Sequence, residues 1–299
     1  MSLERRTYTY KQAGAHQIKA DVYLTGEAGP RPVIIWVHGG CLIMGHRGLL
    51  AGWQRALYLS AGFTVVSIDY RLAPETKLPA IIEDLRDACR WAREEGPRLF
   101  AADPARTAVI GHSAGGYLAL MAGFAVSPRP AALVSFYGYG DIVGPWYSQP
   151  DPHYLQQPLV SRERALSVVG HEVISGTPTP HDREDFYLYC RQQGLWPNEV
   201  AGHDPAKEPD FFLPYCPVRN VDPSYPPTLL LHGDRDTDVP YQQSVIMREK
   251  LAESGVPHEL VTIPGGEHGF DHDRDSAAVA QAFERVMSLL SSQARPGRP

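Results

Sequence analysis

The chain has 299 residues, of which 43% are hydrophobic and 21% charged, and its formal net charge is −6. This balance is typical of a folded globular protein rather than a disordered one, and Lys and Arg form no basic stripe, which excludes the usual signature of a nucleic-acid partner. The first residues, MSLERRTYTYKQ, hold no apolar segment like that of a secretory signal, and no stretch reaches the length of a membrane span, so we expect a cytoplasmic protein without a membrane partner.

The cysteines are far apart in the sequence, with no CxxC pair and no histidine at metal spacing: Cys41, Cys89, Cys190 and Cys216. Free buried thiols are the interpretation that we favour. A disulfide between Cys190 and Cys216 is the alternative. The spacing therefore predicts no metal site.

The N-terminal part alternates apolar and polar residues over 7–11 and 17–24, which predicts two half-exposed antiparallel strands. Short, nearly continuous apolar runs follow and predict buried parallel strands at 32–38, 63–69, 107–112, 131–138, 227–233 and 258–265. Helical periodicity lies between these runs, at 79–95, 114–125, 241–254 and 276–290. Strands that alternate with helices predict an α/β fold, with a mostly parallel sheet and helices on both of its faces.

One segment, 141–226, interrupts this alternation. It is rich in Pro, Tyr, Phe, Trp and His and holds no convincing strand. Pro180 is a good helix start and Gly194 a good helix stop, and a weaker helix is expected around 162–169. Because a loop of this length is unusual in a compact domain unless it has a function, we interpret it as a helical cap inserted into a single domain that spans 1–299.

The pattern Gly-His-Ser-Ala-Gly at 111–115 follows the strand at 107–112, and a helix begins at once. This is the G-x-S-x-G pattern of a nucleophile elbow, in which glycines permit a turn that is too sharp for flanking side chains. The bare pattern is weak evidence, but its place between a strand and a helix makes it much more specific. The sequence therefore predicts Ser113 as a nucleophile, with the positive end of the helix dipole beneath it.

A serine hydroxyl needs a base to take its proton and an acid to orient that base. In chains with such an elbow, the acid follows the serine and the histidine follows the acid. The candidates for the acid come just after the strand at 227–233, and composition does not choose among them: Asp234, Asp236 and Asp238. The predicted base is His268, in a glycine-flanked loop after the last strand, with His272 as the fallback. Both loops leave the carboxyl edge of the sheet, where open α/β sheets place their sites.

The strand at 32–38 ends in the sequence HGGC, at 38–41. Glycines there let backbone N–H groups approach a substrate carbonyl, so this loop is predicted to form one side of an oxyanion hole. The other donor is the N–H of Ala114, the residue after the nucleophile.

With these motifs the chain resembles the hormone-sensitive-lipase-like carboxylesterases of the α/β-hydrolase superfamily. The motifs are HGG at 38–40, DYRLAPE at 69–75, GHSAGG at 111–116, HGDRDTDVP at 232–240 and GGEHGF at 265–270. The chain is also similar to prolyl-oligopeptidase-like hydrolases and to feruloyl-esterase and arylformamidase relatives. The resemblance implies the α/β-hydrolase fold, Asp236 as the acid, and Gly40 and Cys41 as donors of oxyanion N–H groups. It implies no metal and no organic cofactor.

Two departures from the family's pattern matter. Cys41 stands where the family has a third glycine, although only its N–H is needed. The family's N-terminal cap helices are not expected, because the first strand starts near Thr7, so the cap should come mainly from 141–226. This cap holds aromatic residues that either line the substrate pocket or pack the cap onto the sheet: Trp146, Tyr147, Phe211, Phe212 and Tyr215.

We therefore expect a serine carboxylesterase that hydrolyses small-molecule esters with short or aromatic acyl groups through an acyl-enzyme intermediate. An amidase, peptidase or arylformamidase with the same triad is the first alternative, because these residues do not separate amides from esters. A catalytically silent ligand-binding protein on this fold is a less favoured one. An interfacial lipase is disfavoured, because the helix expected at 180–193 is not strongly apolar. The strand at 258–263, expected at the edge of the sheet, could pair in a homodimer.

Overall fold

The computed structural model describes residues 3–25, 29–177, 179 and 183–294. The described residues form one eight-stranded sheet in the order β1-β2-β4-β3-β5-β6-β7-β8. Its strands are β1 Leu3–Ala13, β2 His16–Thr25, β3 Arg31–Val37, β4 Thr64–Ile68, β5 Ala102–His112, β6 Ala132–Phe136, β7 Thr228–Gly233 and β8 His258–Ile263. β1 pairs antiparallel with β2 and β2 antiparallel with β4, whereas every pair from β4 to β8 is parallel. The predicted fold class is confirmed.

Both faces of the central parallel strands β3, β4, β6 and β7 are buried, whereas β8, at the edge of the sheet, is partly exposed. In β3, Val33 and Ile35 belong to the hydrophobic core on one face, whereas Ile34 and Trp36 belong to the core on the other. Since each of these central strands is covered on both sides, its sequence is a nearly continuous apolar run and not an alternation.

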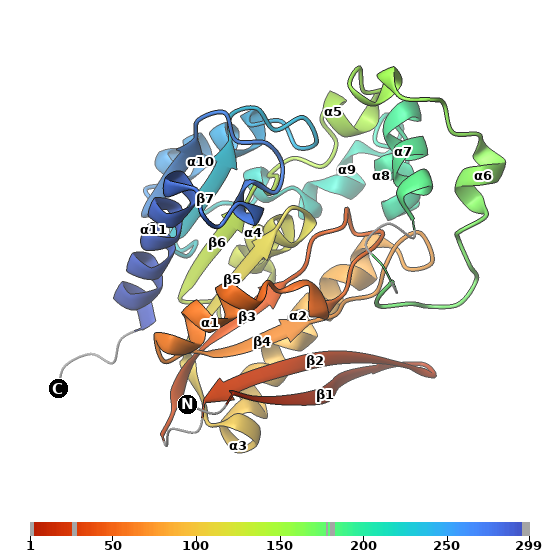
Figure 1. Cartoon of the computed structure of the whole chain (residues 1–299). Helices are drawn as coiled ribbons and strands as arrows, with labels where there is room; N and C mark the ends of the chain where they lie inside the picture. The colour runs from red at the N-terminus through yellow and green to blue at the C-terminus, as the bar shows by residue number, and fades with distance from the viewer. Residues whose placement is uncertain (1–2, 26–28, 178, 180–182, 295–299) are drawn as a thin grey trace.

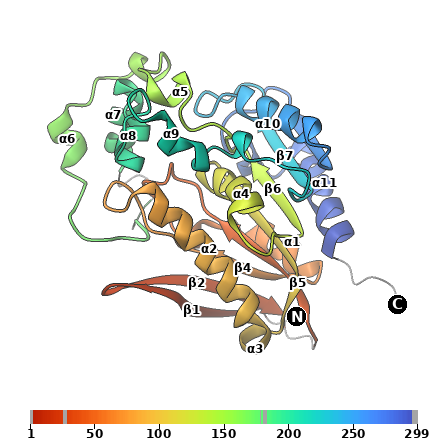
Figure 2. The same ribbon diagram turned by 180° about the vertical axis from the view of Figure 1, so that it is seen from behind.

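Helices supply the cover on each face. The first core includes residues of α2 (Leu78–Glu94), α4 (Ala114–Ala125) and α10 (Gln242–Glu253). The second includes residues of α1 (Gly52–Ser60) and α11 (Ala277–Ala294). The first view shows α1 in front of the sheet (Figure 1), and the reverse view brings α2 to the front (Figure 2).

Helix α1 and the short α3 (Gly96–Phe100) lie outside the predicted elements. The N-cap of α1 is Ala51, whose side chain makes no capping hydrogen bond, and its buried residues are Gln54, Tyr58 and Leu59. Without a capping residue and with a polar residue on its buried face, α1 carries a weak sequence signal.

The described part of 141–226 contains helices but no strand. The helices are α5 Pro145–Ser148, α6 Arg162–Leu166, α7 Glu184–Gln193, α8 Trp196–Ala201 and α9 Pro209–Phe212, with 3-10 turns at Tyr154–Gln156, Leu213–Tyr215 and Pro217–Arg219. Gly194 ends α7 in a left-handed conformation with φ of 67°, as predicted, whereas the predicted start at Pro180 lies outside the described residues. Figures 1 and 2 both show α5 to α9 gathered together at one end of the molecule.

All four cysteines are free and buried, so the alternative disulfide between Cys190 and Cys216 is wrong. In the described ranges, no cluster of His, Cys, Asp or Glu has the arrangement of a metal site. No helix in this part of the chain is both long and apolar enough to cross a bilayer. β8 lies at one edge of the sheet, and its pairing in a homodimer stays a prediction.

Candidate active site

Ser113 lies on a strained turn between β5 and α4. Its φ of 56° and ψ of −120° belong to a region that residues with a side chain rarely adopt. A Cβ on Gly111 would lie 1.9 Å from the backbone oxygen of Gly115, and a Cβ on Gly115 would lie 2.1 Å from the backbone oxygen of Val37. Both glycines are therefore required by close backbone contacts, as the elbow pattern predicts.

The loop after β7 brings Asp236 to the loop after β8, where His268 lies. The Nδ1 atom of His268 is 2.7 Å from Oδ2 of Asp236. The other oxygen, Oδ1, accepts the backbone N–H groups of Asp238 at 2.9 Å and Val239 at 2.8 Å, and Nε2 of His232 lies 3.2 Å from Oδ2. These contacts fix the orientation of the Asp236 carboxylate, which in turn orients the imidazole of His268.

These contacts also determine the charge of Asp236. Burial alone would raise the pKa of the carboxyl group, but the hydrogen bonds from His232 and His268 outweigh burial and hold the pKa well below its ordinary value. His232 is itself fixed, because its Nδ1 lies 2.7 Å from the hydroxyl of Ser244 and its Nε2 lies 2.9 Å from the carbonyl of Val239. His232 therefore supports the acid loop, as its place at a strand end suggests.

The second ring nitrogen of His268 faces a different carboxylate. Nε2 lies 3.4 Å from Oδ2 of Asp238, and the edge of the Tyr137 ring packs on the imidazole with centroids 4.6 Å apart. No hydrogen bond joins Nε2 to the hydroxyl of Ser113 in this arrangement of the described residues, although both side chains line one cavity. Burial would lower the pKa of His268, but Asp238 and Asp236 outweigh it and raise the pKa above its ordinary value.

The glycine loop after β3 packs against the elbow. A Cβ on Gly39 would lie 3.3 Å from Cβ of Ser113. Gly40 and Cys41 have φ of 102° and 60°, and the carbonyl of Gly40 accepts the N–H groups of the two residues 43 and 44. In the described hydrogen-bond network, the N–H groups of Gly40, Cys41 and Ala114 have no acceptor. These three amides thus lie near Ser113 with their hydrogen-bonding capacity unused.

Two aromatic rings support the base of this loop. The His38 ring stacks on Tyr70 with centroids 4.2 Å apart, and the Tyr70 hydroxyl donates to the carbonyl of His38 at 3.0 Å. Burial lowers the pKa of His38 to about 3, so this imidazole is neutral at physiological pH. His38 and Tyr70 therefore brace the loop, and Tyr70 is the part of the DYRLAPE motif that reaches the site.

A cavity of about 680 Å³ opens above Ser113 and His268. Its wall includes the loop at 39–41 and side chains from β3, the elbow and the cap. The aromatic lining residues are Trp36, Tyr137, Tyr154 and Tyr187. The volume is that of a small-molecule site, and the lining combines apolar side chains with carboxylates and other polar groups.

The five aromatic residues that the sequence offered as pocket lining do not line this cavity. Tyr147 stacks between Trp146 at 3.6 Å and Trp196 at 4.1 Å, and Phe211 stacks on His203 at 3.7 Å. Phe212 is buried, and Tyr215 packs near Phe211 with centroids 5.4 Å apart. For Trp146, Tyr147, Phe211, Phe212 and Tyr215 the pocket prediction is wrong, and the packing interpretation describes them.

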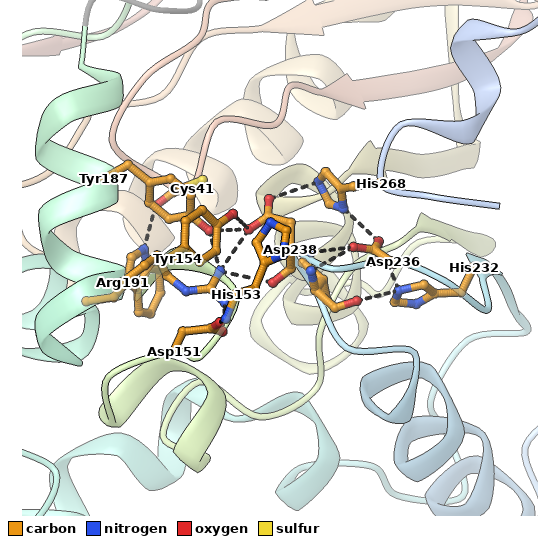
Figure 3. A network of polar contacts seen from close by, with 12 residues as sticks. Cys41, Asp151, His153, Tyr154, Tyr187, Arg191, His232, Asp236, Asp238 and His268 are labelled. Atoms are coloured by element: carbon orange, nitrogen blue, oxygen red, sulfur yellow. Dashed lines mark hydrogen bonds and ion pairs between the residues drawn. The ribbon is translucent and has the colours of Figure 1, made fainter. Parts of the chain in front are cut away.

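A buried polar network connects the cap to the site, and sequence reasoning missed it (Figure 3). Arg191 of α7 has a fully buried side chain and lies 2.8 Å from Oδ1 of Asp238 and 2.5 Å from Oδ2 of Asp151. The hydroxyl groups of Tyr154 and Tyr187 both donate to Oδ1 of Asp238. We call these residues the Arg191 cluster: Asp151, Tyr154, Tyr187, Arg191 and Asp238. The one signal in the sequence was Asp238 itself, two residues after the predicted acid.

A sequence model of the alpha/beta hydrolase fold matches residues 34–272. The chain belongs to the α/β-hydrolase family. Two solved structures of similar fold are an alpha/beta hydrolase superfamily protein from Enterococcus faecalis (24% identity, TM-score 0.76, 97% of this chain and 99% of that chain) and the carboxylesterase EstE1 cloned from a metagenomic library (22%, 0.71, 99% and 90%).

A sequence relative belongs to a much larger protein. The non-reducing polyketide synthase ausA of Aspergillus calidoustus is 29% identical to this α/β-hydrolase over 333 aligned residues. The alignment covers 94% of this chain but 14% of the synthase, so the chain spans only a small part of that relative.

Proposed function

We propose that this α/β-hydrolase is a serine carboxylesterase in which Ser113, His268 and Asp236 form the catalytic triad. The observation that carries the proposal is the 2.7 Å contact between His268 Nδ1 and Asp236 Oδ2 at the wall of a cavity that Ser113 also lines. The unused N–H groups of Gly40, Cys41 and Ala114 support it, because an oxyanion hole requires such donors beside the nucleophile. Carboxylesterases also occur among the solved structures of similar fold.

In the first half of the reaction, Ser113 Oγ attacks the ester carbonyl carbon while its proton passes to Nε2 of His268. Asp236 keeps the proton on Nδ1 and stabilises the imidazolium that forms. The carbonyl oxygen becomes an oxyanion that accepts hydrogen bonds from the amides of Gly40, Cys41 and Ala114. His268 then gives its proton to the leaving alcohol, and the acyl group remains on Ser113.

In the second half, His268 takes a proton from water and the resulting hydroxide attacks the acyl-enzyme. The tetrahedral intermediate collapses, the acid leaves, and the proton returns to Ser113 Oγ. Both halves require His268 Nε2 to turn from Asp238 toward Ser113. Such a contact commonly forms only in the substrate complex.

The test combines covalent labelling with turnover. A fluorophosphonate probe should label the wild-type protein at Ser113, and p-nitrophenyl acetate or benzoate should be hydrolysed far faster than the matched anilides, because amides are poorer electrophiles. Ser113→Ala should abolish both labelling and turnover, whereas Ser60→Ala, on the exposed end of α1, is the matched control that should keep both. Turnover that persists in Ser113→Ala would disprove the nucleophile, and preferential hydrolysis of anilides would favour the amidase alternative.

Similarity to the polyketide synthases supports a second candidate, in which the same triad releases or transfers a polyketide acyl group. The aromatic lining of the cavity suits a large aromatic acyl group. The two candidates differ in the acyl donor. Faster turnover of an aromatic N-acetylcysteamine thioester than of its oxygen ester, beyond their intrinsic difference in reactivity, would favour this second candidate.

A further inference from the structure

The two carboxylate oxygens of Asp238 differ in how many hydrogen bonds they accept. Oδ1 accepts hydrogen bonds from Tyr154 at 2.7 Å, from Arg191 at 2.8 Å and from Tyr187. Oδ2 has one polar neighbour among the described residues, which is Nε2 of His268 at 3.4 Å. Figure 3 shows these contacts around Asp238. Asp238 lines the cavity, and its side chain is 18% exposed. Oδ2 is therefore an acceptor at the cavity wall, held in place by the Arg191 cluster.

The carboxyl group of Asp238 stays ionised. Burial would raise its pKa, but His268, Arg191 and the two tyrosine hydroxyls outweigh burial and lower the pKa below its ordinary value. During the proposed reaction, Nε2 must serve Ser113 and the leaving oxygen, so Oδ2 loses its only neighbour among the described residues. A charged acceptor left without a donor in a partly buried site is unfavourable. A substrate with a hydrogen-bond donor close to Oδ2 removes this unfavourable contribution.

The position of Oδ2 relative to His268 identifies the part of the substrate that it meets. The imidazole protonates the leaving alcohol, so a carboxylate next to the His268 ring lies on the leaving-group side of the site even after Nε2 turns toward Ser113. The carbonyl oxygen lies on the other side, at the amides of the loop at 39–41. We propose that Asp238 is a specificity-determining residue that accepts a hydrogen bond from a hydroxyl group of the leaving alcohol. The preferred substrates are then monoesters of diols and polyols. This inference rests on the proposed esterase function.

Other charges of the cavity agree with this substrate class. Its lining includes four carboxylates, Glu184, Asp185, Asp238 and Asp271, and among the described lining residues there is no Lys or Arg. Two of the four, Asp185 and Asp238, pair with arginines that do not line the cavity, Arg164 and Arg191. Such a wall disfavours alcohols that carry a carboxylate or phosphate and accepts neutral hydrogen-bond donors.

The experiment compares two esters of similar length and equal acyl group, 2-hydroxyethyl benzoate and n-propyl benzoate. After correction for their rates of hydroxide-catalysed hydrolysis, kcat/KM of the wild-type protein should favour the hydroxyethyl ester by roughly 10–100-fold, the value of a hydrogen bond to a charged group. Both rates depend equally on the protonation of His268, so their ratio isolates recognition of the hydroxyl group.

Asp238→Asn is the decisive variant. The donors of Tyr154, Tyr187 and Arg191 will hold the amide oxygen at the Oδ1 position, so the amide nitrogen, which cannot accept, replaces Oδ2. The preference should fall to less than about 3-fold, since the hydrogen bond from the hydroxyl group of the substrate to Oδ2 is lost. Asp151→Asn is the matched control, because it also removes a carboxylate partner of Arg191 but does not line the cavity, and it should keep the preference.

Three results would overturn the inference. One is equal corrected kcat/KM for the two esters in the wild-type protein, which needs no variant and so does not depend on folding. Another is a preference that Asp238→Asn retains. The third is a loss of preference in Asp151→Asn that equals the loss in Asp238→Asn. Such a result would mean that the preference depends on the cap as a whole and not on Asp238. If neither ester is hydrolysed and the fluorophosphonate probe does not label Ser113, the proposed function fails and this inference with it.

Discussion

Replacement of Arg191 by methionine tests whether the Arg191 cluster joins the cap to the catalytic loops. The guanidinium is fully buried, contacts Asp151 and Asp238, and lies 4.5 Å from the centroid of the Tyr154 ring and 5.0 Å from that of Tyr147. Methionine keeps much of the volume of the arginine side chain but removes its charge. The two carboxylates are then left without their shared cation.

The size of the effect follows from this burial. Loss of one partner from a buried ion pair costs about 3–5 kcal/mol of unfolding free energy. The carboxylates keep 12% and 18% exposure, so water can replace part of the lost interaction, and we expect the lower end, about 3 kcal/mol. For a chain of 299 residues this corresponds to a fall in Tm of about 5 °C.

Differential scanning calorimetry measures this fall directly. Arg164→Met is the matched control, since Arg164 also lies in the cap and pairs with an aspartate, Asp185, but its side chain is 69% exposed. Its Tm should stay within about 1 °C of the wild-type value. Adding Asp238→Asn to Arg191→Met removes one unpaired charge and should recover part of the loss. Equal Tm values for the Arg191 and Arg164 variants would refute this account of the cluster.

Three other predictions concern the triad and the elbow. Asp236→Asn should lower kcat by about ten-thousandfold with a p-nitrophenyl ester, by analogy with serine proteases, whereas Asp234→Asn should change it little; the opposite result would reassign the acid. The pKa of His268 is raised, and only the neutral imidazole can accept a proton, so kcat/KM should increase with pH along a limb whose midpoint lies above about 6.5; a midpoint at or below this value would contradict the assigned environment. Gly115→Ala should reduce the unfolding free energy by about 3 kcal/mol or more in urea titrations, because its Cβ would lie 2.1 Å from a backbone oxygen. Gly52→Ala should be tolerated, because its Cβ would lie 3.8 Å from a side-chain nitrogen of Arg55.

The architecture could be predicted from local patterns in the sequence. Continuous apolar runs predicted the parallel strands, because double burial leaves no polar face to alternate with. The nucleophile elbow could also be predicted from the sequence, since local backbone geometry next to Ser113 requires Gly111 and Gly115. The sequence also predicted that Asp236 and His268 would lie at the same edge of the sheet, because parallel strands present their carboxyl ends together.

Which cap residues reach the cavity could not be predicted from the sequence, because this depends on how the folded cap packs. A buried aromatic residue has the same sequence signal whether it packs against other rings, as Tyr147 does, or lines a cavity, as Tyr187 does. The pairing of Arg191 with Asp238, 47 positions apart, depends on how the cap folds back over the acid loop. No local pattern encodes such a contact, because its partners meet only when the chain between them has folded.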